Sequence, residues 1–416
     1  MSSSPPQNTS QEILRSAFAS KDRPLVSQGL PFPDACLKHV STTFNVSRIY
    51  IISSGSLARN TDALERLQRA LEGRVVGTRV GMKPHTYFRE VLEIVHDARE
   101  ARADCIVTLG GSSLTDGAKV VALALANDVV NAADLLALPH IFDKPGSKPH
   151  AQPSAIPIIS IPTTLSGAEY TKYGGVTEDG TNIKYQFGPL QGPQLVILDA
   201  QLAASTPVAL WLSTGVRCVD HRVETLGSLL SDAASDAAAA DSFAALLVGL
   251  LRTRADPSDA EARGLCLAGG AGAMTFLARG VPLGASHGIG HMLGPLGVGH
   301  GETSCVLLPA VCKYNAAHSA AAGRRQLRVL ELLWGDATLR ALLTDRGLHE
   351  GTADLGDALD VYIRELGMPR TLREVGIGRD QLDRLAEASL KDRWLPTNPV
   401  PITEKEQVME ILKMVE

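Results

Sequence analysis

The chain of 416 residues lacks several features that identify common protein classes. Aromatic residues make up 4% of it, which is too few for the stacking platforms of proteins that bind single-stranded nucleic acid. The 45 acidic and 40 basic residues leave a net charge of −5, so no basic surface for nucleic acid is expected. No uninterrupted apolar run reaches about 18 residues, and we therefore expect no membrane span.

Cysteine pairs and a signal-like amino terminus are also missing. The six cysteines are scattered without a CxxC pair, which excludes a zinc ribbon and a disulfide framework and predicts a reducing, cytoplasmic location. Residues 1–22 begin with a polar, serine- and proline-rich stretch that has no apolar core. This segment does not resemble a secretory signal and is predicted to be a flexible tail.

Hydrophobic residues make up 44% of the chain, enough for a sizeable core, and in the first half they follow an alternating pattern. Strand-like apolar runs are separated by stretches with helical spacing. The expected strands are 47–53, 74–80, 104–109, 155–161 and 194–198, and the expected helices are 60–71, 87–102 and 116–126. This alternation predicts a parallel sheet with right-handed crossovers, whose ligands bind at the carboxyl ends of the strands.

The character of the sequence changes near residue 200. The remainder is rich in Ala and Leu and contains almost no β-branched runs, as residues 233–253 and 259–278 illustrate. We therefore predict a Rossmann-like α/β domain over residues 23–200 and an all-helical domain over residues 201–416.

A glycine turn follows the expected strand 104–109. Gly110, Gly111 and Ser112 stand between that strand and the next helix, where backbone N–H groups and a helix amino terminus can hold a phosphate. The pattern is neither the dinucleotide signature nor the P-loop. Taken alone, it is equally typical of a tight turn that is capped by Ser113 or Thr115.

A second polar turn follows the expected strand 155–161. Thr163, Thr164 and Ser166 offer hydroxyl groups to a ribose or a phosphate, although a simple capping turn has the same composition. Two such turns after adjacent strands favour a nucleotide site.

Histidines gather in the second half. His287 and His291 are one helical turn apart, and the glycine-rich stretch after them allows His300 to return to the same place. His221 lies on an earlier helical segment. Histidine suits proton transfer near neutral pH and metal ligation, and a grouping of this kind favours an active site over isolated structural histidines.

Together these motifs resemble the iron-containing (group III) alcohol dehydrogenase family over nearly the whole chain. The family's GGGSPxDxAK turn corresponds to residues 110–119, its PTT turn to residues 162–164, and its HxxxH pattern with a later histidine to His287, His291 and His300. The spacing within residues 162–171 and 215–221 is most similar to maleylacetate reductases and their fungal relatives. The resemblance implies the dehydroquinate synthase-like architecture, with the active site in a cleft between the two domains.

The resemblance also implies where NADH or NADPH binds. Gly110, Gly111, Ser112 and Asp116 would hold the diphosphate and the nicotinamide side, while Thr163, Thr164, Ser166 and Lys184 would contact phosphate or ribose. Ser54 takes the place where an acidic residue often selects NADH, so a 2′-phosphate is not repelled there.

One residue departs from the pattern of metal-dependent members, which place Asp four residues before the first ligand histidine. This chain has Arg217 there. Asp220 directly precedes His221 and lies about 100° from it around a helix, so it cannot take over the same geometry. We therefore expect no divalent metal, or a weak site made by His221, His287 and His300. Arg217 suits a carboxylate-bearing substrate, although a salt bridge to Glu224 or another neighbour is an alternative.

The implied reaction is hydride transfer from NAD(P)H to a small oxo or enoic acid, as in the reduction of maleylacetate. His287 or His291 is the candidate proton donor, and His221 or His300 its electrostatic partner, with a histidinium replacing the metal charge. Two alternatives stay open: a metal-dependent alcohol dehydrogenase, and a non-redox lyase or cyclase in which Ser112 crowds the diphosphate. The expected partners are a small substrate and a second copy of the chain.

Overall fold

The chain folds into two compact units, which are described separately. The computed structural model describes residues 11–83, 86–141, 143, 148, 150–181, 183–188 and 190–416. The first unit comprises Met1–Thr163 and Ala168–Ser205, and the second comprises Thr164–Gly167 and Thr206–Glu416. The main division therefore lies close to the boundary predicted between residues 200 and 201.

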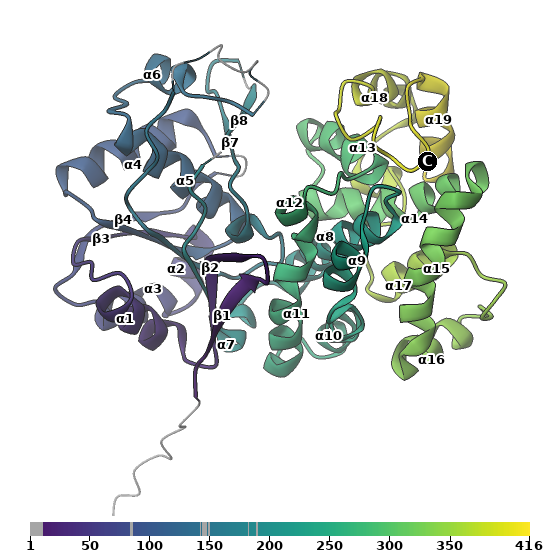
Figure 1. Cartoon of the computed structure of the whole chain (residues 1–416), viewed down its shortest axis with the longest axis horizontal. Helices are drawn as coiled ribbons and strands as arrows, with labels where there is room; N and C mark the ends of the chain where they lie inside the picture. The colour runs from purple at the N-terminus through teal and green to yellow at the C-terminus, as the bar shows by residue number, and fades with distance from the viewer. Residues whose placement is uncertain are drawn as a thin grey trace, which may run out of the picture. The chain divides into compact units, whose positions relative to one another are not determined.

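The first unit alternates strands and helices (Figure 1). Its strands are β1 (Ile13–Phe18), β2 (Lys21–Gln28), β3 (Ile49–Ser53), β4 (Val75–Val80), β5 (Cys105–Gly110), β6 (Ile158–Pro162), β7 (Gly174–Thr177), β8 (Lys184–Phe187) and β9 (Leu195–Leu198). Its helices are α1 (Phe32–Thr42), α2 (Gly55–Asn60), α3 (Ala63–Ala70), α4 (Phe88–Glu100), α5 (Ser112–Ala126), α6 (Ala132–Ala137), the 3₁₀ helix η1 (Ala168–Tyr170) and α7 (Ala200–Ala203).

Seven strands form one sheet in the order β1-β2-β9-β6-β5-β3-β4, and all neighbours are parallel except β1 and β2. The chain leaves β3 toward β4 on one side and then returns to β5 on the other side of β3. The strand order thus reverses between β3 and β5, and such a reversal opens a ligand crevice at the carboxyl ends of the strands.

Side chains on the two faces of the sheet build two separate cores. On one face Tyr50, Ile52 and Ile106 pack with α4 and α5. On the other face Ile51 and Val107 pack with α1 and α3, and Figure 1 shows these two pairs of helices on opposite sides of the sheet. The alternation along β3 and β5 is the two-residue period of a strand buried on both faces.

The amino-terminal prediction is wrong for the described part of residues 1–22. Residues 13–18 form β1, and β2 starts at Lys21, so both belong to the sheet instead of a flexible tail. Leu25 and Val26 of β2 pair with Leu195 and Val196 of β9, which anchors the hairpin. β1 was not predicted because it is an edge strand whose first four residues are exposed, so it lacks the apolar pattern of a buried strand.

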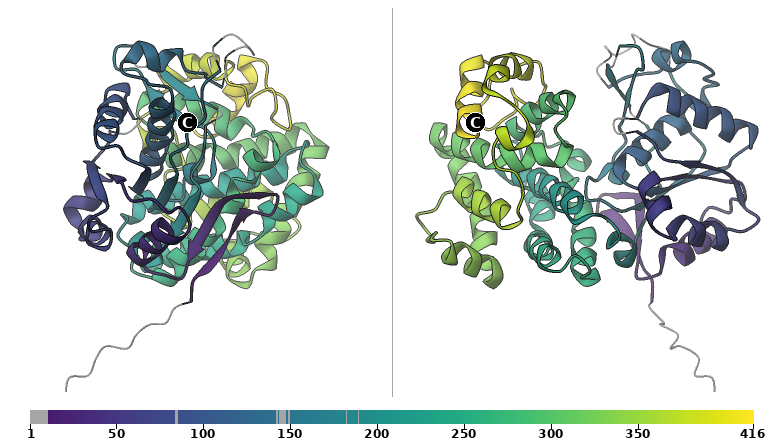
Figure 2. Two further views of the ribbon diagram at one scale, coloured as in Figure 1. Left: turned by 60° about the vertical axis from the view of Figure 1, so that its left-hand side comes forward. Right: turned by 180° about the vertical axis from the view of Figure 1, so that it is seen from behind.

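The second unit contains helices and no strand among its described residues (Figure 2). They are α8 (Val208–Gly227), α9 (Ala233–Ala240), α10 (Phe243–Ala255), α11 (Ala260–Ala273), α12 (Thr275–Arg279), α13 (Ala285–Leu293), η2 (Gly294–Leu296), α14 (His300–His318), α15 (Ala320–Gly335), α16 (Ala337–Asp345), α17 (Leu355–Glu365), η3 (Arg373–Val375), η4 (Arg379–Gln381), α18 (Leu382–Ser389) and α19 (Lys405–Met414). The predicted order of an α/β domain followed by an all-α domain is confirmed.

One segment of this unit, Ala233–Ala255, has the length and the mean hydropathy, 1.4, of a membrane-crossing helix. It is divided into α9 and α10 at Ser242, whose φ of 56° interrupts the helix. Phe243, Leu246 and Leu247 of α10 are fully buried. The segment therefore has the character of a core element of the helical unit.

Candidate functional site

Two neighbouring strand ends of the first unit, those of β3 and β5, lie against each other. Ser54 follows β3 and Gly110 ends β5, and the Ser54 N–H donates to the Leu109 carbonyl at 2.9 Å. The next strand joins them through the Thr163 N–H, which donates to the Gly110 carbonyl at 3.1 Å. The two polar turns predicted from the sequence therefore do follow adjacent strands, β5 and β6.

Only glycine fits at position 110. Its φ is +142°, and a Cβ there would lie 2.7 Å from the Ser54 Cβ and 2.8 Å from Leu114 Cδ1. The close approach of the two strand ends therefore depends on the absence of a side chain.

The amino terminus of α5 is open to a ligand. Its N-cap residue is Gly111, and no side chain caps the first turn. Thr115 instead exchanges hydrogen bonds with Thr108 and Ser160 in the interior, so capping by Thr115 does not occur. The Ser112 hydroxyl is buried without a partner among the described residues. Free N–H groups and this hydroxyl fit the diphosphate of a nicotinamide dinucleotide.

The other predicted cofactor residues lie in different settings. Thr163 and Thr164 are buried, and Thr164 Oγ1 has no partner in the described part of the chain. Ser166 is half-buried, and Lys184 is exposed on β8, in the separate two-stranded sheet β7-β8. Lys184 pairs with Thr177 in that sheet, and its side chain lies over Gly175, where a Cβ would be 2.4 Å from Lys184 Cε.

Asp116 of α5 forms an ion pair with the buried Lys119 at 2.8 Å. Lys119 also donates to Thr171 Oγ1 at 2.9 Å and to the Ala168 carbonyl at 3.0 Å. Glu169 next to that carbonyl is 3% exposed, and burial raises its pKa to about 7. Asp116, which was predicted to contact the cofactor, therefore forms an ion pair within the protein, and its contact with a cofactor stays a prediction.

In the second unit the four predicted histidines form a row. The ring centroids of His221 and His287 are 4.6 Å apart, those of His287 and His291 are 6.5 Å apart, and those of His291 and His300 are 6.1 Å apart. His221 belongs to α8, His287 and His291 to α13, and His300 begins α14. The structure therefore confirms that the chain returns after α13 and brings His300 beside His291.

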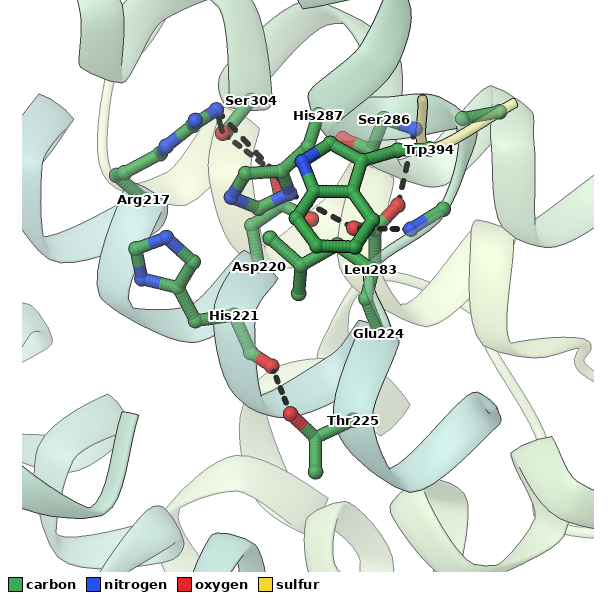
Figure 3. Close-up of polar contacts among 12 residues, drawn as sticks. Arg217, Asp220, His221, Glu224, Thr225, Leu283, Ser286, His287, Ser304 and Trp394 are labelled. Carbon is green, nitrogen blue, oxygen red and sulfur yellow. Dashed lines mark hydrogen bonds and ion pairs between the residues drawn. The ribbon is translucent and has the colours of Figure 1, made fainter. Parts of the chain in front are cut away.

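Arg217 lies beside this row and is 4% exposed (Figure 3). Its Nη1 donates to Ser304 Oγ at 3.1 Å and lies 3.9 Å from Asp220 Oδ2. Asp220 in turn accepts hydrogen bonds from Ser286 at 2.9 Å and from Ser304 at 2.5 Å. The neighbour that pairs with Arg217 is thus Asp220, which also contacts Ser286 of α13 and Ser304 of α14.

Glu224 holds the beginning of α13. It accepts hydrogen bonds from the Gly284 N–H at 3.0 Å and the Ser286 N–H at 2.9 Å. Its Oε2 lies 2.7 Å from His287 Nδ1, so the same carboxyl group fixes the ring of His287. A carboxyl group at a helix amino terminus satisfies N–H groups that have no partner within the helix.

Burial controls the charges in this cluster. It raises the pKa of Asp220 to about 6 despite the opposing influence of Arg217, and it raises the pKa of Glu224 well above its usual range, with Asp220 adding to the effect. Burial and then the charge of Arg217 lower the pKa values of His221 and His287 well below the ordinary value. The fixed positive charge is therefore that of Arg217, and a histidinium at His221 or His287 is disfavoured.

Three buried atoms of the cluster have no hydrogen-bond partner among the described residues: Asp220 Oδ1, His221 Nδ1 and His287 Nε2. Unpaired buried polar atoms are costly and uncommon in native proteins. A bound substrate with polar groups could form hydrogen bonds with these three atoms and so remove the cost of leaving them unpaired.

The cluster contains one group of residues that could hold a metal ion, and it differs from the histidine set predicted from the sequence. Among the described residues, only Asp220, Glu224 and His287 bring three ligand atoms within 4.8 Å of one another, whereas His221, His287 and His300 do not. Asp220 Oδ2, both oxygens of Glu224 and His287 Nδ1 are engaged in the hydrogen bonds given above, whereas Asp220 Oδ1 and His287 Nε2 have no partner among the described residues. The guanidinium of Arg217 beside Asp220 would also repel a cation.

Two residues of this cluster were not predicted from the sequence. Ser304 lies 84 positions from Asp220, and Asp392, which lies 2.8 Å from His291 Nδ1, is 101 positions from that histidine. The only local signal is the placement of Ser304 one helical turn after His300. The Asp392 contact has no such signal.

Comparisons with known proteins agree with this geometry. The iron-containing alcohol dehydrogenase profile matches residues 31–200, and the profile of the carboxyl-terminal part of that family matches residues 211–415. The dehydrogenase FUM7 of Gibberella moniliformis is 41% identical, over 96% of this chain and 97% of its own. A maleylacetate reductase of a Rhizobium species is 31% identical, over 75% of each chain. The crystal structure of the Agrobacterium tumefaciens maleylacetate reductase superposes with a TM-score of 0.72 at 25% identity, covering 92% of this chain and 93% of the other.

Proposed function

Because the chain belongs to the iron-containing alcohol dehydrogenase family and is an NAD(P)-dependent oxidoreductase, we propose that it reduces a small carboxylate-bearing oxo or enoic acid without a bound metal. The observation that carries this proposal is Arg217, a buried guanidinium at the position where metal-dependent relatives have a carboxylate. A substrate that resembles maleylacetate carries two carboxylates, and one of them can pair with this guanidinium.

Arg217 is suited to bind such a substrate. Only its Nη1 has a hydrogen-bond partner among the described residues, Ser304. The remaining guanidinium N–H groups are available to a carboxylate, and pairs of this type are strong and directional. Asp220 limits the affinity, since it already offsets part of the positive charge.

The residues of the helical unit would stabilise the developing charge, deliver a proton and exclude water. The nicotinamide supplies the hydride when it is bound. Arg217 stabilises the negative charge that develops on the substrate, in place of a metal or a histidinium. An imidazole of α13 delivers the proton, and His291 is favoured over His287, whose charged form is disfavoured by burial. The buried ring of His221, with Phe276 stacked 5.0 Å away, excludes water from one side.

The cofactor we propose is NADPH. Ser54 has no carboxylate, and its hydroxyl lies 3.0 Å from the hydroxyl of Ser56. Arg59 of the same short helix approaches Gly55 with its Nη1. Hydroxyl and guanidinium groups favour a 2′-phosphate, which an acidic side chain would repel.

A substrate survey tests the proposal. Purified protein is incubated with NADPH or NADH and with dicarboxylate oxo acids, monocarboxylate oxo acids, simple aldehydes or simple alcohols. We expect the highest kcat/KM with a dicarboxylate and NADPH. A preference for uncharged aldehydes or alcohols would support a metal-dependent alcohol dehydrogenase, and no turnover together with no cofactor binding by calorimetry would support a non-redox enzyme.

Two further properties remain predictions. All six cysteines are buried free thiols, which fits the cytoplasmic location that we propose. A homodimer is proposed from the family alone, and light scattering of the purified protein measures it.

A further inference from the structure

Asp392 reaches the histidine row from a distant part of the chain. It lies three residues after α18, and its Oδ2 is 2.8 Å from His291 Nδ1 on α13. Its Oδ1 accepts a hydrogen bond from the Trp394 N–H at 2.9 Å, so both carboxylate oxygens are engaged. The side chain is 11% exposed. Asp392 is therefore held rigidly against one specific nitrogen of His291.

The approach of this segment depends on Gly288. A Cβ at position 288 would lie 3.2 Å from Asp392 Oδ1 and would overlap Leu395. Leu395 is fully buried in the core that α13 shares with α14 and α18. The segment after α18 is thus packed onto α13 in a way that fixes the Asp392–His291 contact.

His291 and His287 differ in their access to solvent. The His287 side chain is 1% exposed, its Nδ1 faces Glu224 and Asp220, and burial lowers its pKa. The His291 side chain is 27% exposed. A proton donor must be reprotonated from solvent after each turnover, and of these two rings only that of His291 is open enough for that exchange.

We propose that Asp392 is a positioning residue that fixes the tautomer of His291 and makes its Nε2 the proton-donating atom. This inference rests on the reductase function proposed above. An ionised carboxylate can only accept, so Nδ1 must donate to Asp392 and Nε2 faces the substrate. In the reduction, the hydride of NAD(P)H and the Nε2 proton of the His291 imidazolium both go to the substrate. NAD(P)⁺ and a neutral imidazole remain, and the imidazole then takes a proton from water.

Few titratable groups surround His291. Asp392 faces it from the segment after α18, His287 from its own helix and His300 from α14. Burial lowers the pKa of the Arg217 guanidinium on α8, and Asp392 is close enough to oppose that shift, as Asp220 and Glu224 also do. Asp392 is the only acidic group within hydrogen-bond distance of the ring among the described residues.

Substitution of Asp392 tests the role. Asp392→Asn keeps the shape but can donate to Nδ1 and favour the other tautomer, so we expect kcat to fall about 100-fold. The KM and the cofactor Kd should change less than about threefold, because neither ligand needs Asp392 for binding. Asp392→Glu should restore part of kcat.

The matched control is Asp383→Asn on α18. Asp383 is 71% exposed and pairs with Lys405, so its substitution should leave kcat unchanged. A kcat of Asp392→Asn within about threefold of the parent would overturn the proposal. Equal losses of kcat, cofactor affinity and melting temperature would also overturn it, because they would show a purely structural role.

Histidine-selective ¹⁵N NMR of the unmodified protein gives a second test that does not require a stable Asp392 variant or a known substrate. The His291 signals are assigned by their loss in His291→Gln. The proposal predicts a ring protonated at Nδ1 in the neutral form, and a ring protonated at Nε2 would contradict it. An Nδ1-protonated ring in a protein that reduces no oxo acid would instead show that the proposed function is wrong while the contact is right.

Discussion

The guanidinium of Arg217 and the carboxylate of Asp220 lie one turn apart on α8, with Nη1 3.9 Å from Oδ2 and both side chains almost completely buried. The hydroxyl of Ser304 bridges them, since it accepts from Arg217 and donates to Asp220. This arrangement provides a fixed cation beside the histidine row. It also explains why burial raises the pKa of Asp220 only to about 6 and no further.

The first prediction concerns Arg217 itself. Arg217→Ala should raise the KM for a dicarboxylate oxo acid by about tenfold or more, since a charge-assisted pair contributes about 1.5–3 kcal/mol. Arg217→Lys is the control that keeps the charge but loses the planar fork, and it should give a smaller loss. Steady-state kinetics with dicarboxylate and monocarboxylate substrates measure the effect. An unchanged KM in the alanine variant would remove the carboxylate-binding role.

The second prediction concerns cofactor choice. Ser54→Asp places a carboxylate beside the ribose site and should lower kcat/KM for NADPH about tenfold relative to NADH, by repulsion of the 2′-phosphate. The helix α2 should tolerate the change, because Asp is a favourable N-cap residue. Ser54→Asn is the uncharged control of the same shape. If Asn and Asp lower NADPH use equally, charge at this position does not decide the preference.

The third prediction concerns the glycine turn. Gly110→Ala should lower the free energy of unfolding by about 3 kcal/mol and abolish cofactor binding, since the new Cβ would overlap Ser54 and Leu114. Gly73→Ala is the control: its φ is +77° but nothing lies within 4 Å, so only about 1 kcal/mol of backbone strain is expected. Chemical unfolding and calorimetric titration measure both. Equal losses in the two variants would mean that the close approach at Gly110 is unimportant.

The fourth prediction concerns the buried Glu169. Burial raises its pKa from 4.5 to about 7, so between these pH values the folded protein keeps a proton that the unfolded chain has lost. The free energy of unfolding should therefore decrease as the pH rises through this window, by up to about 3 kcal/mol from this group. Glu169→Gln has no ionisable group here and lacks this decrease. The free energy of unfolding of the variant, relative to that of the parent, should therefore increase as the pH rises from 4.5 to 7. The exposed Glu72→Gln serves as the control, and a Glu169→Gln difference that does not vary with pH would contradict the assignment.

Much of the fold could be predicted from local patterns. The strands β3, β5, β6 and β9 are compact apolar runs, and burial on both faces of the sheet produces this pattern directly. The break between α9 and α10 was not predicted, because Ala-rich flanks on both sides of Ser242 continue the helical pattern through it. The hairpin β1-β2 was missed because it has no local periodicity that marks it as sheet. It joins the sheet through the tertiary pairing of β2 with β9.

The site was predictable only where its residues lie close together in the sequence. His287, His291 and His300 are near neighbours in the chain, and their grouping is confirmed. The hydrogen bonds that orient them connect residues 63 and 101 positions apart, those of His287 with Glu224 and of His291 with Asp392. Long-range contacts of this kind depend on how helices pack, and one sequence gives no indication of them.

Metal analysis combined with chelation shows whether the proposed reductase works without a metal. The purified protein is assayed with NADPH and a dicarboxylate oxo acid before and after treatment with a chelator, and its metal content is determined by mass spectrometry. We predict unchanged activity and far less than one metal ion per chain. Loss of activity on chelation, with recovery on addition of zinc or iron, would contradict the account.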